Sequence, residues 1–326
     1  MLTSKQSNML FTAKALAVLL VVWAHMYIGA PAVLENIRVS VCQMGVPVFF
    51  VCAGFFYKRQ KNDHAQSWKK KGKTILFPWV LFATATFLLS VLLSGSAAGF
   101  PLSYIKWVFG LGTVYWYMSV MLLCFVVFRW YVCSADASRK TWYLYGCIAV
   151  SLLMVIISMC SVIDYNLNFN QYTNAFNWFG WFALGILIRE KQWLDRVSSW
   201  KAGATAFPLL IVFCVLSVCR EPGMEAYIDI YSLPIEILGT VCILAMSRLL
   251  CNGKLLVDVG KKSFFIYLVH IQIAGVTNTR LPSHWLFFLV KPIAAVAICY
   301  VVAKVCEWIL KKINLYDKLG SFLALR

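Results

Sequence analysis

Charged residues are scarce in this 326-residue chain: Asp, Glu, Lys and Arg make up 13% of it, whereas hydrophobic residues make up 61%. No polar stretch is long enough for a soluble domain, and apolar runs of about 18 or more residues recur from end to end. Such a composition excludes a water-soluble globular protein. It predicts an all-α polytopic membrane protein with a single domain, residues 1–326.

The sequence also lacks the signatures of several common kinds of site. It has no internal repeat, no Gly-rich phosphate-binding loop after a strand and no metal-binding motif. The four histidines are too scattered to match the spacing of metal ligands: His25, His64, His270 and His284. Most of the 12 cysteines lie inside apolar runs, which is typical of packed free thiols and not of a disulfide framework. We therefore expect no metal cofactor.

Ten apolar segments are candidate transmembrane helices. Their approximate bounds are residues 10–32, 39–57, 74–95, 112–133, 141–163, 173–189, 202–219, 231–250, 262–281 and 285–311. The first segment ends at Ala30-Pro31-Ala32, small residues of the kind found where signal peptides are cleaved. Its apolar region is too long for a signal peptide and contains Lys14 and His25, so we expect a transmembrane helix.

The 30 Lys and Arg residues outnumber the 13 Asp and Glu residues, which gives a net charge of +17. In a soluble protein this excess would suggest nucleic-acid binding, but the placement of the charges explains it better. Most basic residues lie at the two termini and in alternate loops, within residues 58–73, 129–140, 189–201 and 248–262. The other loops contain only Arg38, Lys106, Arg220, Arg280 and Lys291. By the positive-inside rule, both termini are cytoplasmic and the number of spans is even. We expect membrane lipids as partners and no nucleic acid.

The first span carries two ionisable residues, Lys14 and His25. At about 100° per residue, they lie on one face of a helix and about 16 Å apart. Ionisable groups inside a membrane are costly and usually face a protein interior or a water-filled pocket. With the helix entering from the cytoplasm near Leu10, Lys14 would lie about 6 Å deep and His25 about 22 Å deep.

A cation near the cytoplasm and a titratable imidazole deeper in the membrane suit a long ligand, with phosphates at one end and a reactive group at the other. Acyl-coenzyme A has this form. Each residue also has a purely structural interpretation. Lys14 could extend to the inner lipid headgroups, and His25 could be hydrogen-bonded for packing.

Four other sequence motifs follow Lys14 and His25 in order along the chain. They are Val46-Pro47-Val48-Phe49-Phe50-Val51-Cys52-Ala53-Gly54, Lys73-Thr-Ile-Leu-Phe-Pro78, Tyr115-Trp116-Tyr117 and Gly260-Lys-Lys-Ser263-Phe-Phe-Ile-Tyr267-Leu-Val-His270. Together they resemble the integral-membrane acyltransferases of acyltransferase family 3, whose first helix has an Arg, ten intervening residues and a His. The resemblance covers about residues 10 to 310.

The resemblance implies transfer of a small acyl group, most often acetyl, from cytoplasmic acyl-coenzyme A to a hydroxyl of an envelope glycan or lipid-linked sugar. It places the chain in the cytoplasmic membrane of a bacterium. His25 would be the general base that takes the proton of the attacking hydroxyl. Lys14 would contact a phosphate or the pantetheine arm of the donor. Lys70 and Lys73 would also meet the donor phosphates, unless they only set the topology and contact lipid headgroups.

Further candidates lie in other spans. Glu236, at a depth comparable to that of His25, could orient the imidazole or bind the acceptor; its structural alternative is a carboxylate at the lipid boundary. His270 could contact the donor or make a core hydrogen bond to a neighbouring helix. Gln43, Trp116 and Tyr117 are candidate acceptor-binding residues, although aromatic residues at the outer end of a span also serve as interfacial anchors.

Two departures from the family pattern leave alternatives open. Lys14 stands where the family has Arg, and it lacks the planar guanidinium that can hold a phosphate with two hydrogen bonds. We also expect no extra-cytoplasmic domain, so membrane-embedded residues, short outer loops or a partner would recognise the acceptor. A non-enzymatic exporter or binding protein for a lipid-linked glycan or small polar molecule is the second possible function. The sequence leaves open whether the chain forms a homodimer.

Overall fold

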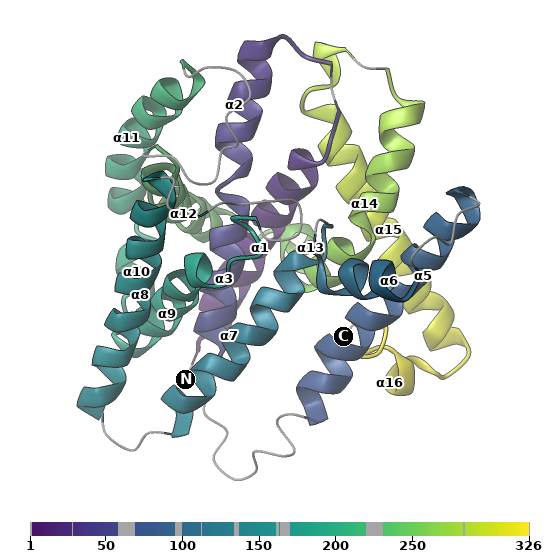
Figure 1. The fold of residues 1–326 in the computed structure, drawn as a ribbon, viewed down its shortest axis with the longest axis horizontal. Coiled ribbons are helices and arrows are strands. Elements are labelled where there is room, and N and C mark those ends of the chain that lie inside the picture. The colour runs from purple at the N-terminus through teal and green to yellow at the C-terminus, as the bar shows by residue number, and fades with distance from the viewer. Residues whose placement is uncertain are drawn as a thin grey trace.

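The computed structural model describes residues 2–27, 29–57, 69–94, 100–111, 113–133, 137–160, 163, 170–219, 231–282 and 284–325. All regular secondary structure in these segments is helical, which confirms the expected all-α fold (Figure 1). The elements are α1(Ser4–Ala24), α2(Ala32–Cys42), α3(Gly45–Phe56), η1(Gly72–Leu76), α5(Phe77–Ser94), α6(Phe100–Phe109), α7(Trp116–Cys133), α8(Ala137–Met159), α9(Phe176–Glu190), α10(Leu194–Val197), α11(Trp200–Val218), α12(Ser232–Leu250), α13(Lys254–Lys261), α14(Ser263–Arg280), η2(Trp285–Phe287), α15(Val290–Lys312) and α16(Tyr316–Leu319).

Among the described residues, seven helical segments are long and apolar enough to cross a membrane. They are Ser4–Ala24, Ala32–Phe56, Lys69–Leu93, Arg139–Met159, Trp200–Val218, Ser232–Leu250 and Val290–Lys312. Each overlaps a span predicted from the sequence, and together they make the chain a multi-pass membrane protein. The other three predicted spans overlap α7, α9 and α14, of which α9 has only 15 residues.

The ends of the first helix differ from the prediction of residues 10–32. α1 begins at Ser4 because Thr3 and Gln6 form a capping box, in which each side-chain oxygen accepts from the backbone N–H of the other residue at 3.2 Å. The helix ends at Ala24, before a turn in which Gly29 has a φ of +63°. His25 therefore lies at the C-terminal end of α1 and not inside a longer span.

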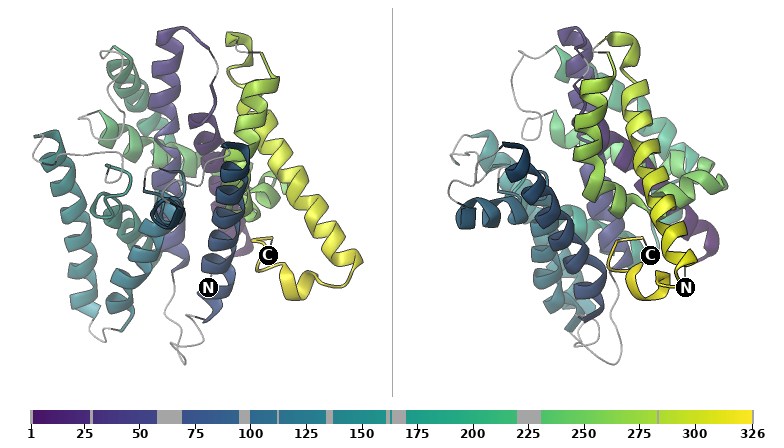
Figure 2. Two further views of the ribbon diagram at one scale, coloured as in Figure 1. Left: turned by 45° about the vertical axis from the view of Figure 1, so that its right-hand side comes forward. Right: turned by 90° about the vertical axis from the view of Figure 1, so that its right-hand side faces the viewer.

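The second predicted span, residues 39–57, is made of two consecutive helices. α2 and α3 meet at Gln43 and Met44, and Pro47 lies in the first turn of α3, where its missing N–H needs no helical partner. The short helix α6 was not among the predicted spans. Figure 2 shows it lying across the direction of the long helices.

α1 lies in the middle of the bundle. It packs against α2, α3, α12, α13, α14 and α15. Its buried side chains, such as Leu10, Val18 and Val22, point in several directions around the helix, as expected for a helix surrounded by others. Lys14 and His25 are thereby placed among helices that come from distant parts of the sequence.

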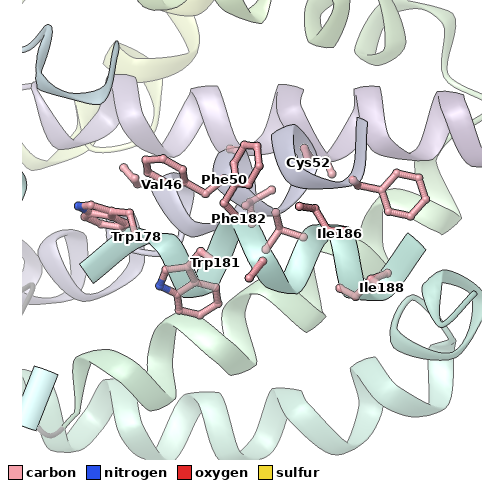
Figure 3. Close-up of a cluster of buried hydrophobic side chains, with 14 of the residues drawn as sticks. Val46, Phe50, Cys52, Trp178, Trp181, Phe182, Ile186 and Ile188 are labelled. Atoms are coloured by element: carbon pink, nitrogen blue, oxygen red, sulfur yellow. The ribbon is translucent and has the colours of Figure 1, made fainter. Parts of the chain in front are cut away.

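α3 and α9 approach closely because two glycines lie at their interface. A Cβ atom on Gly54 would lie 2.0 Å from the carbonyl oxygen of Phe182, and one on Gly185 would lie 2.1 Å from that of Val51. Small residues at such contacts are typical of helix pairs in membranes. Figure 3 shows the large side chains of both helices, including Phe50 and Phe182, that fill the space around the contact. This packing fixes α3, which supplies part of the site described below.

The two ends of the chain lie in the same half of the bundle, whereas α2 begins and α14 ends in the opposite half (Figure 1). The C-terminal segment packs back onto the helices. Lys262 forms an ion pair with Glu307 at 3.0 Å and donates a hydrogen bond to the carbonyl oxygen of Leu325. Through Lys262, these contacts tie the last residues to the junction of α13 and α14 and to α15.

Candidate active site

A cavity of about 460 Å³ is lined by residues of α1, α3, α7 and α14. Lys14 and His25 both line it, as do Trp116 and Tyr117 at the start of α7. Most of the other lining residues are apolar or aromatic, which is usual for ligand pockets of this size. The structure thus brings four of the predicted site residues together around one space.

The aromatic residues of α7 belong to an array around this cavity. The ring of Tyr117 lies 4.9 Å from that of Phe50 and 5.4 Å from that of Tyr267. The ring of Trp116 lies 5.3 Å from that of Trp178. Trp116 and Tyr117 therefore face the interior of the protein, where their flat apolar surfaces are available to a bound ligand.

Lys14 has neither a hydrogen-bond acceptor nor an acidic partner in the described part of the chain. Its Nζ lies 5.7 Å from the ring centroid of Phe11, and Nζ of Lys261 lies 5.7 Å from the same centroid. Phe11 in turn stacks on Phe56, a residue that lines the cavity. Two cations therefore lie near this part of the cavity, where an anion or a polarised carbonyl oxygen would be stabilised.

The backbone around His25 is held by polar side chains from three other helices. Arg38 of α2 donates to the carbonyl oxygens of Ala24 at 2.8 Å and Trp23 at 3.3 Å. Asn278 of α14 donates to the carbonyl oxygen of His25 at 3.3 Å and accepts from the N–H of Tyr27 at 2.9 Å. These bonds satisfy carbonyl groups that the end of α1 would leave without partners.

Lys291 of α15 completes this support. It is fully buried, and its Nζ donates to the carbonyl oxygen of Tyr27 at 2.8 Å. Cations at the C-terminal end of a helix also interact favourably with its dipole. Sequence reasoning counted Arg38 and Lys291 only as rare charges on the outer side and did not select Asn278. A lone cation in or beside a predicted span is the signal that could have found Arg38 and Lys291.

His270 is fully buried beside His25, with the two ring centroids 5.2 Å apart and the ring planes inclined at 48°. Its Nδ1 lies 2.5 Å from the carbonyl oxygen of Tyr267, and its Nε2 has no hydrogen-bond partner among the described residues. The sequence left two interpretations of His270 open, contact with the donor and a core hydrogen bond to a neighbouring helix. The structure places it next to the imidazole of His25.

Glu236 does not belong to the described lining of the main cavity. It is buried and lines a second cavity of about 100 Å³, together with Gln171, Asn177 and Trp178. The ring of Trp178 lies 5.3 Å from that of Trp116, which lines the first cavity, so this aromatic pair lies between the two spaces. The expectation that Glu236 orients the imidazole therefore has no support from its position.

Gln43 is also placed apart from the four residues of the main cavity. Its side chain is fully buried, and within the described part of the chain both polar atoms of its amide lack a hydrogen-bond partner. It does not belong to the described lining of the main cavity. The acceptor-binding role predicted for Gln43 therefore stays a prediction.

The basic loop contributes a lysine that sequence reasoning did not select. Lys70 is exposed, and Lys73 is exposed with its Nζ 4.8 Å from the ring of Phe322. Lys71, in contrast, is partly buried, with its Nζ 4.4 Å from the rings of both Tyr57 and Phe125. A cavity of about 80 Å³ beside Lys71 shares the lining residues Ile75, Met118 and Phe125 with the main cavity. Burial, which the sequence does not report, distinguishes Lys71 from its neighbours.

Comparison with known families bears on the chemistry of this arrangement. A family model described as an acyltransferase domain matches residues 12–308, a range that includes all the candidate residues described above. No curated protein matches the chain, and no solved structure does.

Proposed function

This chain belongs to acyltransferase family 3 and is a membrane acyltransferase for groups other than amino-acyl groups, and we propose that its donor is cytoplasmic acyl-coenzyme A and its acceptor a hydroxyl of an envelope glycan or lipid-linked sugar. Acetyl is the acyl group that we propose. Membership of the family favours this function over the exporter that the sequence left open.

One observation carries the proposal: a single cavity is lined by both Lys14 and His25. The rise of an α-helix separates them by about 16 Å along α1, roughly the length of the pantetheine arm. Lys14 has no acidic partner in the described residues, so its charge is available to a donor phosphate or to a polar group of the arm. Lys71 and Lys261 add positive charge on the approach to this end.

The thioester carbonyl would then lie near His25. The acceptor hydroxyl oxygen attacks the carbonyl carbon while His25 accepts the hydroxyl proton. The carbon–sulfur bond breaks, and the proton on His25 passes to the departing thiolate. The products are free coenzyme A and an O-acyl ester. Trp116 and Tyr117 supply flat apolar surfaces on which a sugar ring can pack.

We further propose ten membrane crossings with both termini in the cytoplasm of a bacterium. The alternation of Lys and Arg between loops supports this topology, and so does the position of both chain ends in the same half of the bundle. In this orientation the Lys14 side of the cavity faces the cytoplasm, where acyl-coenzyme A is available. The His25 side faces the outer half of the membrane, where a lipid-linked acceptor is available.

Replacement of His25 by Ala tests the proposed chemistry. Loss of a general base typically lowers the rate by about 10²–10⁴-fold, so transfer of radiolabelled acetyl from acetyl-coenzyme A to native membranes should fall by this factor. Binding of coenzyme A to the purified variant should persist, because the nucleotide lies at the other end of the cavity. His284→Ala is the matched control, since His284 is an exposed histidine outside the described cavity lining.

The quantity of each variant in the membrane is measured alongside its activity. Wild-type turnover by His25→Ala would refute the role of general base. Activity that falls only in proportion to the amount of inserted protein would show that His25 is needed for folding instead.

A further inference from the structure

The imidazole of His270 has one polar atom whose function is unexplained. A backbone carbonyl can only accept a hydrogen bond, so the 2.5 Å contact with Tyr267 requires the proton of a neutral His270 to be on Nδ1. Its Nε2 then carries a lone pair and no hydrogen. This atom is buried and lacks a partner in the described segments, although buried acceptors in proteins are normally satisfied.

The rings of two polar side chains lie against this imidazole, those of His25 and Tyr267. The hydroxyl of Tyr267 already donates to the carbonyl oxygen of Val114, which leaves His25 as the partner to consider. At a centroid separation of 5.2 Å, the facing edges of two five-membered rings are about 3–4 Å apart, close to hydrogen-bond distance. Rotation about the side-chain torsions of His25 can turn one of its ring nitrogens toward Nε2 of His270. In the described part of the chain the ring of His25 has no hydrogen bond, since Asn278 and Arg38 bond only the backbone near it.

We propose that His270 is a positioning residue, whose Nε2 accepts the N–H of the His25 imidazole that points away from the cavity. The proposal rests on the proposed role of His25 as general base. With one ring nitrogen of His25 bonded to His270 through its hydrogen, the other is unprotonated and faces the acceptor hydroxyl. A general base needs this arrangement, which in other enzymes is often fixed by a carboxylate.

A neutral partner also suits the surroundings of His25. When His25 accepts the hydroxyl proton, its second N–H stays bonded to Nε2 of His270, and no proton moves to His270. The bond stabilises the imidazolium without placing a second charge in an apolar interior.

The alternative is that His270 only ties α14 together through its bond to Tyr267. Two substitutions separate these roles. His270→Asn keeps an N–H near the carbonyl oxygen of Tyr267 and removes the acceptor at the position of Nε2. His270→Gln places an amide oxygen near the position of Nε2 and removes the short bond to Tyr267.

The experiment measures acetyl transfer from acetyl-coenzyme A to native membranes and also the ring nitrogens of His25 by ¹⁵N NMR of the purified, histidine-labelled protein. We expect kcat of His270→Asn to fall by about 10²-fold, the usual effect of a misaligned catalytic group, while KM for acetyl-coenzyme A changes less than about twofold. His270→Gln should keep kcat within about threefold of wild type. The spectrum of the wild type should show one tautomer of His25, and that of His270→Asn should show two.

The proposal is wrong if His270→Asn keeps the wild-type kcat, or if Gln lowers kcat as much as Asn. It is also wrong if His25 of the wild type already populates both tautomers, a measurement that needs no His270 variant to fold. His25→Ala with full activity would instead refute the proposed function. The spectra would still show whether the two imidazoles are bonded, so the two failures are distinguishable.

Discussion

The positive charge of Lys14 should contribute to donor affinity. The size of this contribution can be worked out from the contacts of the ammonium group. The described residues offer Lys14 only the ring of Phe11, at 5.7 Å, near the outer limit of about 6 Å for a cation–π interaction. Within the described residues, the ammonium group of Lys14 therefore makes only this weak interaction, so it is available to bind a ligand. A hydrogen bond to a charged group contributes about 1.5–3 kcal/mol, so Lys14→Ala should raise the Kd of coenzyme A by about 10–150-fold.

Lys14→Arg should bind coenzyme A at least as tightly as the native protein, because a guanidinium can hold a phosphate with two hydrogen bonds. Lys5→Ala is the matched control, since Lys5 is an exposed lysine of the same helix and does not line the cavity. The assay is calorimetric or fluorescence titration of the purified proteins. Dephospho-coenzyme A serves as a second ligand, and the Lys14→Ala effect should persist with it if Lys14 contacts the arm or the diphosphate.

The same titration can refute the reasoning. If Lys14 extends to the inner lipid headgroups, then the native protein and the Ala and Arg variants will bind coenzyme A equally, and the damage from Ala will appear in insertion or stability. Three equal affinities would remove Lys14 from the donor site. An equal loss for Lys5→Ala would show that general surface charge, and not a contact in the cavity, governs binding.

Two further predictions concern the basic loop and the topology. Lys71→Ala should weaken coenzyme A binding more than Lys70→Ala or Lys73→Ala does. The reason is that Lys71 alone of the three lysines is partly buried, against the lining residue Phe125. Equal losses of affinity in titration would indicate that only the summed charge of the loop matters. Single cysteines in place of Lys70 and His284, in an otherwise cysteine-free background, should react with an impermeant thiol reagent from opposite sides of the membrane, and labelling of both from outside would overturn the proposed orientation. The sequence also offers Asn62 and Asn168 as labelling sites, and both lie outside the described residues.

Sequence and structure differ most instructively on the ends of α1. Hydropathy is summed along the chain, so it detected an apolar segment but could not show where the helix begins and ends. The capping box of Thr3 and Gln6 and the turn at Gly29 set those bounds. The predicted spacing of Lys14 and His25 is unaffected by the corrected ends of α1, because it depends only on helical periodicity. The calculated depths assumed a start near Leu10, and they stay a prediction.

Residues of other helices could not be assigned reliably from the sequence. His270 was expected to contact the donor or make a core hydrogen bond, and it lies against His25. Glu236 was expected to orient the imidazole or bind the acceptor, and it lines another cavity. Lys71 was indistinguishable in sequence from the lysines around it. The rotation of each helix about its axis, and its height relative to its neighbours, are set by side-chain packing between segments far apart in the chain.

The sequence by itself determined the all-α membrane fold, the family and the pairing of Lys14 with His25, because composition, ordered motifs and helical periodicity are local properties of the chain. Only the tertiary structure decided that Trp116 and Tyr117 share a cavity with this pair, and that Arg38, Asn278 and Lys291 hold the backbone around His25. Those relations require close contacts such as that of Gly54 with Phe182, where the absence of one Cβ atom allows two helices to meet. The distance between two helices depends on every side chain at their interface. The sequence pattern of either helix alone therefore does not predict this distance.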